Sequence, residues 1–267
     1  MARDSAIEWT DHTFNPWWGC AAVSSACDHC YAESLAKRFG HRTWGAKAPR
    51  RFFGDAHWSE PLAWNAAASR LGRRARVFCA SMADVFENRS ELDAHRNRLW
   101  SLIRATPALD WLLLTKRPQL ISSRLPADWG VGYPNVWLGT TTENQVEADR
   151  RLPHLMKISA ALKFVSAEPL LSSVNLSSWL PGPSAQGLGW VIAGGESGAK
   201  ARPSDPAWFR ALRDQCLAAG VPFHFKQWGN WAPSAEGTTI RQKKSIAGRA
   251  LDGRTWDQLP TVAVLAQ

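Results

Sequence analysis

Six short apolar runs recur along the chain at intervals of about 25–35 residues, and this spacing constrains its fold more than any other feature. The runs are nearly continuous in apolar residues, which is typical of strands covered on both faces. The spacing matches a strand–helix repeat, so we expect an α/β fold with a parallel sheet, either open and doubly wound or closed as a barrel. The runs are Val77–Ala80, Trp111–Leu114, Val136–Gly139, Leu162–Val165, Trp190–Ala193 and Pro222–Phe225.

Helices are predicted between several of these runs. Ser204 is the expected N-cap of one helix, because a short polar side chain there precedes a stretch with apolar residues on one face. Another helix is expected to begin near Ser90. A third places Tyr31, Leu35 and Phe39 at a spacing of four residues, and therefore along one side.

A polar and often charged cluster follows each predicted strand. In a (β/α) barrel the carboxyl ends of all strands meet at one mouth, so these side chains can converge on a ligand. Ordinary helix caps use the same residue types, but six such clusters in register favour a shared site. The residues predicted to line this one cavity are Ser81, Asp84, Thr115, Lys116, Thr140, Glu143, Asn144, Glu168, Glu196 and Lys226.

Three cysteines within eleven residues form the most specific local motif. Cys20, Cys27 and Cys30 have the spacing C-x6-C-x2-C and precede the helix expected near Tyr31. Neighbouring thiolates repel one another unless they share a metal or a cluster. We therefore predict that these three residues ligate one metal centre.

Two kinds of metal centre are compatible with this motif. A structural zinc site normally has four ligands, and His29, His41 or Asp28 is available as the fourth. Three cysteines without an obvious fourth ligand are instead the arrangement expected of an iron–sulfur cluster with one iron left open. Cys79 lies in an apolar strand and Cys216 on an apolar helix face, so both are interpreted as buried small hydrophobes.

The composition predicts one large domain over residues 1–267, with residues 229–267 as a basic appendage. No apolar stretch approaches the roughly 18–20 residues of a membrane span. The first residues lack the apolar core of a secretion signal, so we expect a cytoplasmic protein without membrane contact. The net charge of +9 favours polyanionic partners but identifies none of them.

Basic residues gather in three segments, and aromatic residues interleave with the first. Cations that neutralise phosphates beside rings that stack on bases favour single-stranded or flipped-out DNA or RNA, although a solvated basic surface over core aromatics has the same pattern. The basic residues are Lys37, Arg38, Arg42, Lys47, Arg50 and Arg51, then Arg70, Arg73, Arg74 and Arg76, and finally Arg241, Lys243, Lys244, Arg249 and Arg254.

A series of short motifs extends over nearly the whole chain. They are Ile7–Cys20 with Cys27 and Cys30–Glu33, Ser81–Phe86, Leu114–Pro118, Gly139–Gln145, Ser166–Leu170, Gly194–Gly198, Lys226–Gly229, Ala247–Arg249 and Leu251–Arg254. In these motifs the chain resembles a phage-associated three-cysteine-motif family of unknown function, which is similar to the radical S-adenosylmethionine (SAM) enzymes. Its cysteine loop has three more residues between the first two cysteines than the common C-x3-C-x2-C loop of those enzymes.

The resemblance implies a partial (β/α) barrel of about six or seven mainly parallel strands, with a [4Fe–4S] cluster on Cys20, Cys27 and Cys30. SAM would chelate the open iron. One-electron reduction by a flavodoxin- or ferredoxin-type donor would then cleave SAM to methionine and a 5′-deoxyadenosyl radical, which abstracts a hydrogen atom from the substrate. Asp84 is predicted near the SAM amino group and Glu143 near its ribose hydroxyls. The other strand-end residues are assigned to the same site, and Glu168, Glu196 and Lys226 are expected to contact either SAM or the substrate.

Two other functions use the same residues. A metal-stabilised nucleic-acid-binding protein would need the cysteine motif without SAM chemistry, and a barrel hydrolase would use Glu143, Glu168 and Glu196 as general acids or bases. Iron content separates the radical enzyme from the hydrolase, and SAM binding separates it from the binding protein. The substrate, and whether a separate partner protein completes the site, cannot be read from the residues.

Overall fold

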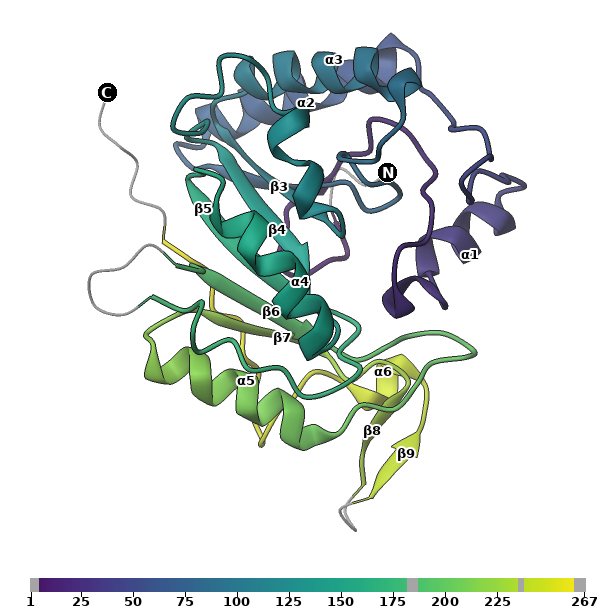
Figure 1. Cartoon of the computed structure of the whole chain (residues 1–267), viewed down its shortest axis with the longest axis vertical. Helices are drawn as coiled ribbons and strands as arrows, with labels where there is room; N and C mark the ends of the chain where they lie inside the picture. Colours follow the sequence, from purple (N-terminus) through teal and green to yellow (C-terminus); the bar gives the residue numbers. More distant parts are fainter. Residues whose placement is uncertain (1–4, 182–186, 235–237, 262–267) are drawn as a thin grey trace.

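The computed structural model describes residues 5–181, 187–234 and 238–261. Seven parallel strands follow one another in chain order and form one curved sheet, a half-barrel (Figure 1). This arrangement confirms the predicted α/β fold with a partial barrel. The strands are β1 (His12–Thr13), β2 (Ala75–Cys79), β3 (Leu109–Thr115), β4 (Val136–Thr141), β5 (Leu162–Ala167), β6 (Trp190–Gly194) and β7 (Phe223–Gln227).

Helices α2 to α5 lie along the outer side of the curved sheet, whereas α1 lies across from them, on its open side (Figure 1). Parallel neighbours require a crossover connection, and these helices supply four of them. The links from β3 to β4 and from β5 to β6 contain no α-helix within the described residues, so the strand–helix repeat is incomplete. The helices are α1 (Tyr31–Arg38), α2 (Asp55–Arg70), α3 (Asp93–Arg104), α4 (Gln145–Met156), α5 (Pro206–Ala218) and α6 (Lys244–Ala247).

Side chains of the strands alternate between two apolar cores. In β3, Trp111 and Leu113 join the large cluster that includes the helices, while Leu112 belongs to a second cluster on the other face. Both faces are buried, which explains why the strands appear as continuous apolar runs. Gly139 is required at this second core, because a Cβ atom there would lie 2.3 Å from the ring of Phe164. The second cluster consists of Trp9, Phe78, Leu112, Trp137, Phe164, Trp190 and Ile192.

The C-terminal part of the described chain covers the outer edge of β7. Phe225 N–H donates to Trp256 O at 2.8 Å, and Phe223 N–H donates to the side chain of Gln258 at 2.9 Å. An uncovered edge strand would expose unpaired backbone groups. This segment therefore completes the sheet on the side away from β1.

Residues 229–261 also include a short antiparallel hairpin. Its strands are β8 (Trp231–Pro233) and β9 (Thr239–Arg241), and it projects from the body of the molecule beside α6 (Figure 1). Ala232, Leu251 and Trp256 belong to the same large core cluster as the sheet. Residues 235–237 and 262–267 of the predicted basic appendage lie outside the described residues.

Two predicted helix starts are displaced by short-range contacts. The N-cap of α5 is Asp205, whose carboxylate accepts from Ala207 N–H at 2.8 Å, and the predicted cap Ser204 instead donates to Leu170 O at 2.6 Å. The helix expected near Ser90 begins there as a 3-10 turn and becomes α3 at Asp93. In both cases the predicted helix is present, but its first residue differs from the predicted one.

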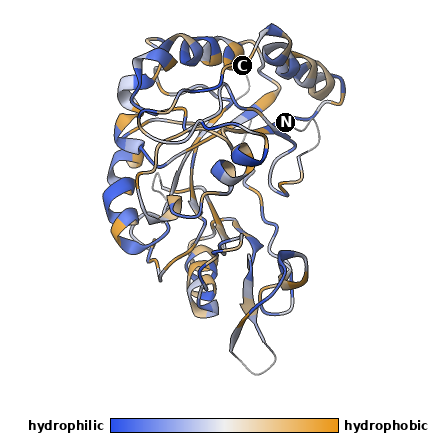
Figure 2. Cartoon of the chain, turned by 90° about the vertical axis from the view of Figure 1, so that its right-hand side faces the viewer, coloured by the Kyte–Doolittle hydropathy of each residue, from blue (hydrophilic) through white to orange (hydrophobic). Residues whose placement is uncertain are grey.

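The helix predicted around Tyr31, Leu35 and Phe39 is present as α1, and Phe39 directly follows its last residue. Ala32 and Ala36 are its buried residues and Leu35 packs beside them, whereas Tyr31 is 54% exposed and Phe39 is 62% exposed. The small alanines allow the helix to pack closely. Figure 2 shows that the helices mix hydrophilic and hydrophobic residues, as expected when one side contacts the core. No helix in the described part of the chain is long and apolar enough to cross a membrane.

His224 gives the fold a pH dependence. The side chain lies buried in β7, and burial lowers its pKa to about 4. The unfolded chain binds a proton at this residue below about pH 6.5, and the folded chain does not, so stability falls as the pH is lowered. We expect the free energy of unfolding to drop by about 1–2 kcal/mol from this residue between pH 7 and pH 5.

Urea unfolding of the His224→Gln variant at both pH values tests this expectation. The variant should lose that part of the pH dependence, and His154→Gln, a change at an exposed position of α4, should keep it. An identical pH slope for wild type and His224→Gln would contradict the prediction.

Candidate active-site cavity

A cavity of about 600 Å³ opens at the carboxyl ends of the parallel strands. Its wall includes the N-terminal segment 6–9, much of the cysteine loop (residues 20–33) and the carboxyl ends of the six strands β2 to β7. Seven of the ten residues predicted to share one cavity line it, so the expected convergence of polar strand ends is present for these seven. They are Ser81, Asp84, Thr115, Lys116, Glu168, Glu196 and Lys226.

The other three predicted residues do not line the cavity. The Thr140 hydroxyl donates to a backbone carbonyl of β3 at 2.9 Å, and Asn144 caps α4 by accepting from Glu147 N–H at 2.9 Å. Thr141 lines the cavity in place of Thr140, because successive side chains of a strand point to opposite faces.

Glu143 does not lie on the cavity wall, and its side chain pairs with an arginine inside the protein. It is fully buried, and its Oε2 accepts from Arg151 Nη1 at 2.7 Å. Burial alone would raise the pKa of this carboxyl, but the guanidinium of Arg151 holds the pKa below its usual value. Glu143 therefore forms an internal ion pair with α4 and does not line the cavity.

Asp84 lines the cavity, but its carboxylate is already occupied by protein donors. One oxygen accepts from the Thr115 hydroxyl at 2.7 Å and from Phe86 N–H at 2.9 Å. The other accepts from Arg117 Nη1 at 2.8 Å and from Lys116 N–H at 3.3 Å. With both oxygens engaged, Asp84 organises the end of β3, and its contact with a ligand amino group stays a prediction.

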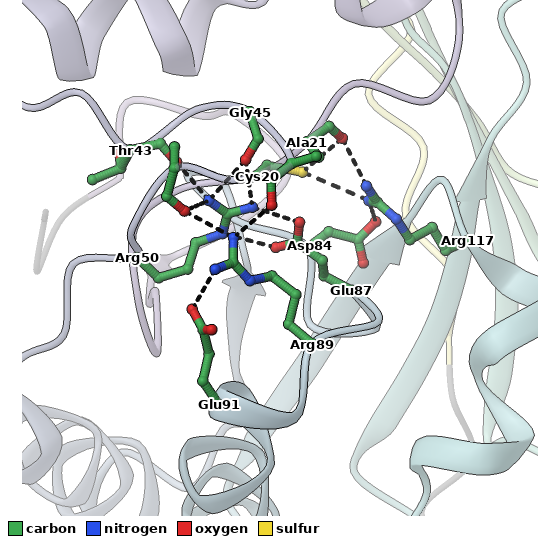
Figure 3. Close-up of polar contacts among 12 residues, drawn as sticks. Cys20, Ala21, Thr43, Gly45, Arg50, Asp84, Glu87, Arg89, Glu91 and Arg117 are labelled. Atoms are coloured by element: carbon green, nitrogen blue, oxygen red, sulfur yellow. Dashed lines mark hydrogen bonds and ion pairs between the residues drawn. The ribbon is translucent and has the colours of Figure 1, made fainter.

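Arg117, which the sequence analysis did not select, connects this carboxylate to the cysteine loop (Figure 3). Its Nη2 donates to Ala21 O at 2.7 Å, and its Nη1 lies 3.6 Å from Cys20 Sγ. Burial, with a smaller contribution from nearby Asp84, raises the pKa of the Cys20 thiol to about 12, and Arg117 opposes this rise. The Arg117 guanidinium places a positive charge beside this sulfur.

All three motif cysteines line the cavity and none forms a disulfide. A 3-10 turn over Ser25–Cys27 and the hydrogen bond from Cys30 N–H to Cys27 O at 3.3 Å bend the loop back on itself. Cys30 then directly precedes α1. The other two cysteines, Cys79 and Cys216, are fully buried, as predicted.

The motif cysteines are soft donors on this wall, and thiolates suit zinc and iron–sulfur clusters alike. Within the described ranges no three His, Cys, Asp or Glu side chains are gathered closely enough to hold a metal ion, so the sulfurs share the cavity without converging. Two of the three predicted fourth zinc ligands have other partners: His29 lies 3.1 Å from Glu196, and Asp28 lies 3.3 Å from Arg202.

Charged pairs from β5, β6 and β7 form the opposite wall. Glu168 Oε1 lies 2.6 Å from Lys226 Nζ, and both side chains are mostly buried. Glu196 accepts from Arg202 at 2.6 and 2.9 Å; burial would raise its pKa, but Arg202 lowers it below the usual value. Because His29 also contacts Glu196, this wall is joined to the cysteine loop.

Two glycines allow the loops after β6 and β7 to cross. A Cβ atom at Gly195 would lie 1.9 Å from Trp228 O, and one at Gly229 would lie 2.2 Å from Glu196 O. Gly229 also has a φ of +81°, which favours glycine. The close crossing fixes the backbone on both sides of Glu196.

The family described as "Protein of unknown function (DUF5131)" has a model that matches residues 4–260. Among solved structures, the chain is similar to a mutant of spore photoproduct lyase with bound AdoMet (SAM) and dinucleoside spore photoproduct, at 12% identity and a TM-score of 0.42. That similarity covers 77% of this chain and 61% of the lyase chain, so less than two thirds of the lyase is represented here. No curated protein matches.

The Arg117–Asp84 pair should contribute strongly to stability. Both side chains are buried, so Arg117→Gln leaves a charged carboxylate without its partner. We expect the free energy of unfolding, measured with urea, to fall by about 3–5 kcal/mol. Arg210→Gln, which breaks an exposed ion pair with Asp252, should cost less than about 1 kcal/mol. Equal losses in the two variants would show that the buried pair does not organise the site.

The crossing at Gly195 should tolerate no side chain. Gly195→Ala places a methyl group against backbone, which cannot move as a side chain can, and we expect a loss of about 1–3 kcal/mol in unfolding free energy. The adjacent Gly194→Ala is the control, because its nearest contact is at 3.4 Å. A Gly195→Ala protein as stable as Gly194→Ala would refute the close crossing.

Proposed function

This chain belongs to the DUF5131 family, and we propose that it is an iron–sulfur enzyme that cleaves SAM reductively and takes a hydrogen atom from a substrate. One observation carries the proposal: Cys20, Cys27 and Cys30 line the same cavity as seven polar residues from the strand ends. The engagement of His29 and Asp28 by other side chains supports three-thiolate ligation.

A [4Fe–4S] cluster held by the three thiolates supplies, when bound, the electron that splits SAM into methionine and a 5′-deoxyadenosyl radical. The chain's own residues bind and orient the reactants. Glu168 and Lys226 offer a carboxylate and an ammonium group on the cavity wall, and these complement the amino and carboxylate groups of SAM. Arg117 keeps a positive charge beside Cys20, where the thiolates bring negative charge together.

Part of the cavity wall is apolar. Ile7, Trp9, Phe78 and Leu114 line it, and Trp9 and Phe78 are buried. An apolar lining excludes water and limits the side reactions open to a reactive intermediate. The reaction also needs a one-electron donor, and a protein of the flavodoxin or ferredoxin class is part of this proposal.

Iron binding should depend on the three motif cysteines alone. After anaerobic reconstitution with iron and sulfide, wild type should show visible absorption, and Cys20→Ala, Cys27→Ala or Cys30→Ala should abolish it. Cys216→Ala, a change at a fully buried cysteine of α5, should leave absorption and iron content unchanged. With dithionite and SAM, wild type should release 5′-deoxyadenosine.

Two results would overturn this proposal. One is stoichiometric iron in the variant that lacks all three motif cysteines. The other is a wild-type protein that takes up zinc in place of iron and leaves SAM intact, which would indicate the metal-stabilised binding protein.

A further inference from the structure

A second cavity, of about 640 Å³, lies beside the first. Glu33 and Trp44 line both cavities, so the two meet at these side chains. The remaining wall comes from the end of α1 and the loop that follows it. Those residues are Lys37, Gly40, His41, Arg42 and Thr43.

Cationic groups predominate on this wall. Arg42 forms no ion pair or hydrogen bond with the described residues. Lys37 lies 2.6 Å from Glu33, but the pair is exposed to solvent and is therefore weak. His41 contacts the ring of Trp18 edge-on, with 5.7 Å between ring centroids. A cavity with these groups favours an anion.

The wall also contains a hydroxyl without a partner. Thr43 is 6% exposed, and its Oγ1 finds no hydrogen-bond partner among the described residues. A buried polar group left in this state costs free energy, so such groups nearly always have partners in proteins. A ligand oxygen in this cavity would supply one.

The loop that carries these groups is held rigidly by a buried arginine (Figure 3). Arg50 pairs with Glu87 at 2.6 and 2.9 Å, and it also donates to the backbone carbonyls of Thr43 at 2.9 Å and Ala48 at 2.8 Å. Gly45 N–H donates to the carbonyl of Cys20 at 2.9 Å, which ties the same loop to the cysteine motif. The position of the cavity wall relative to the candidate active site is therefore fixed.

We propose that this second cavity binds a backbone phosphate of a single-stranded nucleic acid, with the adjoining nucleoside entering the first cavity past Trp44. The proposal rests on the proposed function for what happens in the first cavity. A polymer fits better than a free phosphate ester, because the two cavities adjoin and because two exposed cations, Arg38 and Lys47, flank the same loop and have no ion-pair partner among the described residues. The exposed ring of Phe39 adds a surface for base stacking.

Fluorescence anisotropy with a labelled single-stranded oligonucleotide of mixed sequence tests the proposal on the full chain. Arg42→Gln should weaken binding about fivefold or more and lower the slope of log affinity against log salt by about one. Thr43→Val, of nearly the same shape, should weaken binding without changing that slope. Lys157→Gln removes one positive charge from the exposed end of α4, where it lines neither cavity, and should leave binding unchanged.

Several outcomes would overturn the inference. Equal losses for Arg42→Gln and Lys157→Gln would mean that only net charge matters. Unchanged binding by Thr43→Val would remove the unpartnered hydroxyl from the site. Competition by inorganic phosphate or a mononucleotide as effective as that by the unlabelled oligonucleotide would identify a free phosphate ester as the ligand.

Two results distinguish the phosphate site from the proposed radical chemistry. Oligonucleotide binding that depends on Arg42, in a protein that leaves SAM intact, would support the phosphate site and reject the radical chemistry. Release of 5′-deoxyadenosine by the wild-type protein, together with equal oligonucleotide binding by Arg42→Gln and Lys157→Gln, would support the radical chemistry and reject the phosphate site.

Discussion

The guanidinium of Arg117 joins the end of β3 to the cysteine loop. Arg117 and Cys20, the cysteine that it contacts, are 97 residues apart in the sequence. On one side it pairs with Asp84, which also accepts from Thr115, and on the other it donates to Ala21 O. These groups are buried, so each needs a partner within the protein. The requirement fixes Cys20 against the sheet and thereby sets the position of the cavity mouth.

Arg50 plays the same part on the neighbouring loop, and Figure 3 shows the two arginines on either side of the Cys20 segment. Loops at a barrel mouth carry many small and polar residues, and apolar packing alone cannot hold their backbone carbonyls in place. A planar guanidinium satisfies several carbonyls while its charge is balanced by Asp84 or Glu87. Two buried ion pairs thus determine the shape of both cavities.

The sheet could be predicted because strands buried on both faces leave continuous apolar runs, as in Trp111–Leu114. Thr140 was expected in the cavity, but Thr141 lines it. A shift of one residue moves a side chain to the other face of a strand, and an apolar run without alternation does not show which face each residue takes. Asp84 was placed in the cavity correctly, but its engagement by Arg117 depends on a long-range contact. In the sequence, Arg117 looks like any exposed basic residue after a strand.

The central claim is that the three motif cysteines hold one iron–sulfur centre with an iron open to SAM. Electron paramagnetic resonance of the reconstituted, reduced protein tests it most directly, with spectra recorded before and after addition of SAM. The account predicts a [4Fe–4S] signal whose g values shift when SAM is added, because SAM becomes a ligand of the open iron. A cluster signal that SAM leaves unchanged, or the absence of any cluster signal in protein that has taken up metal, would contradict it.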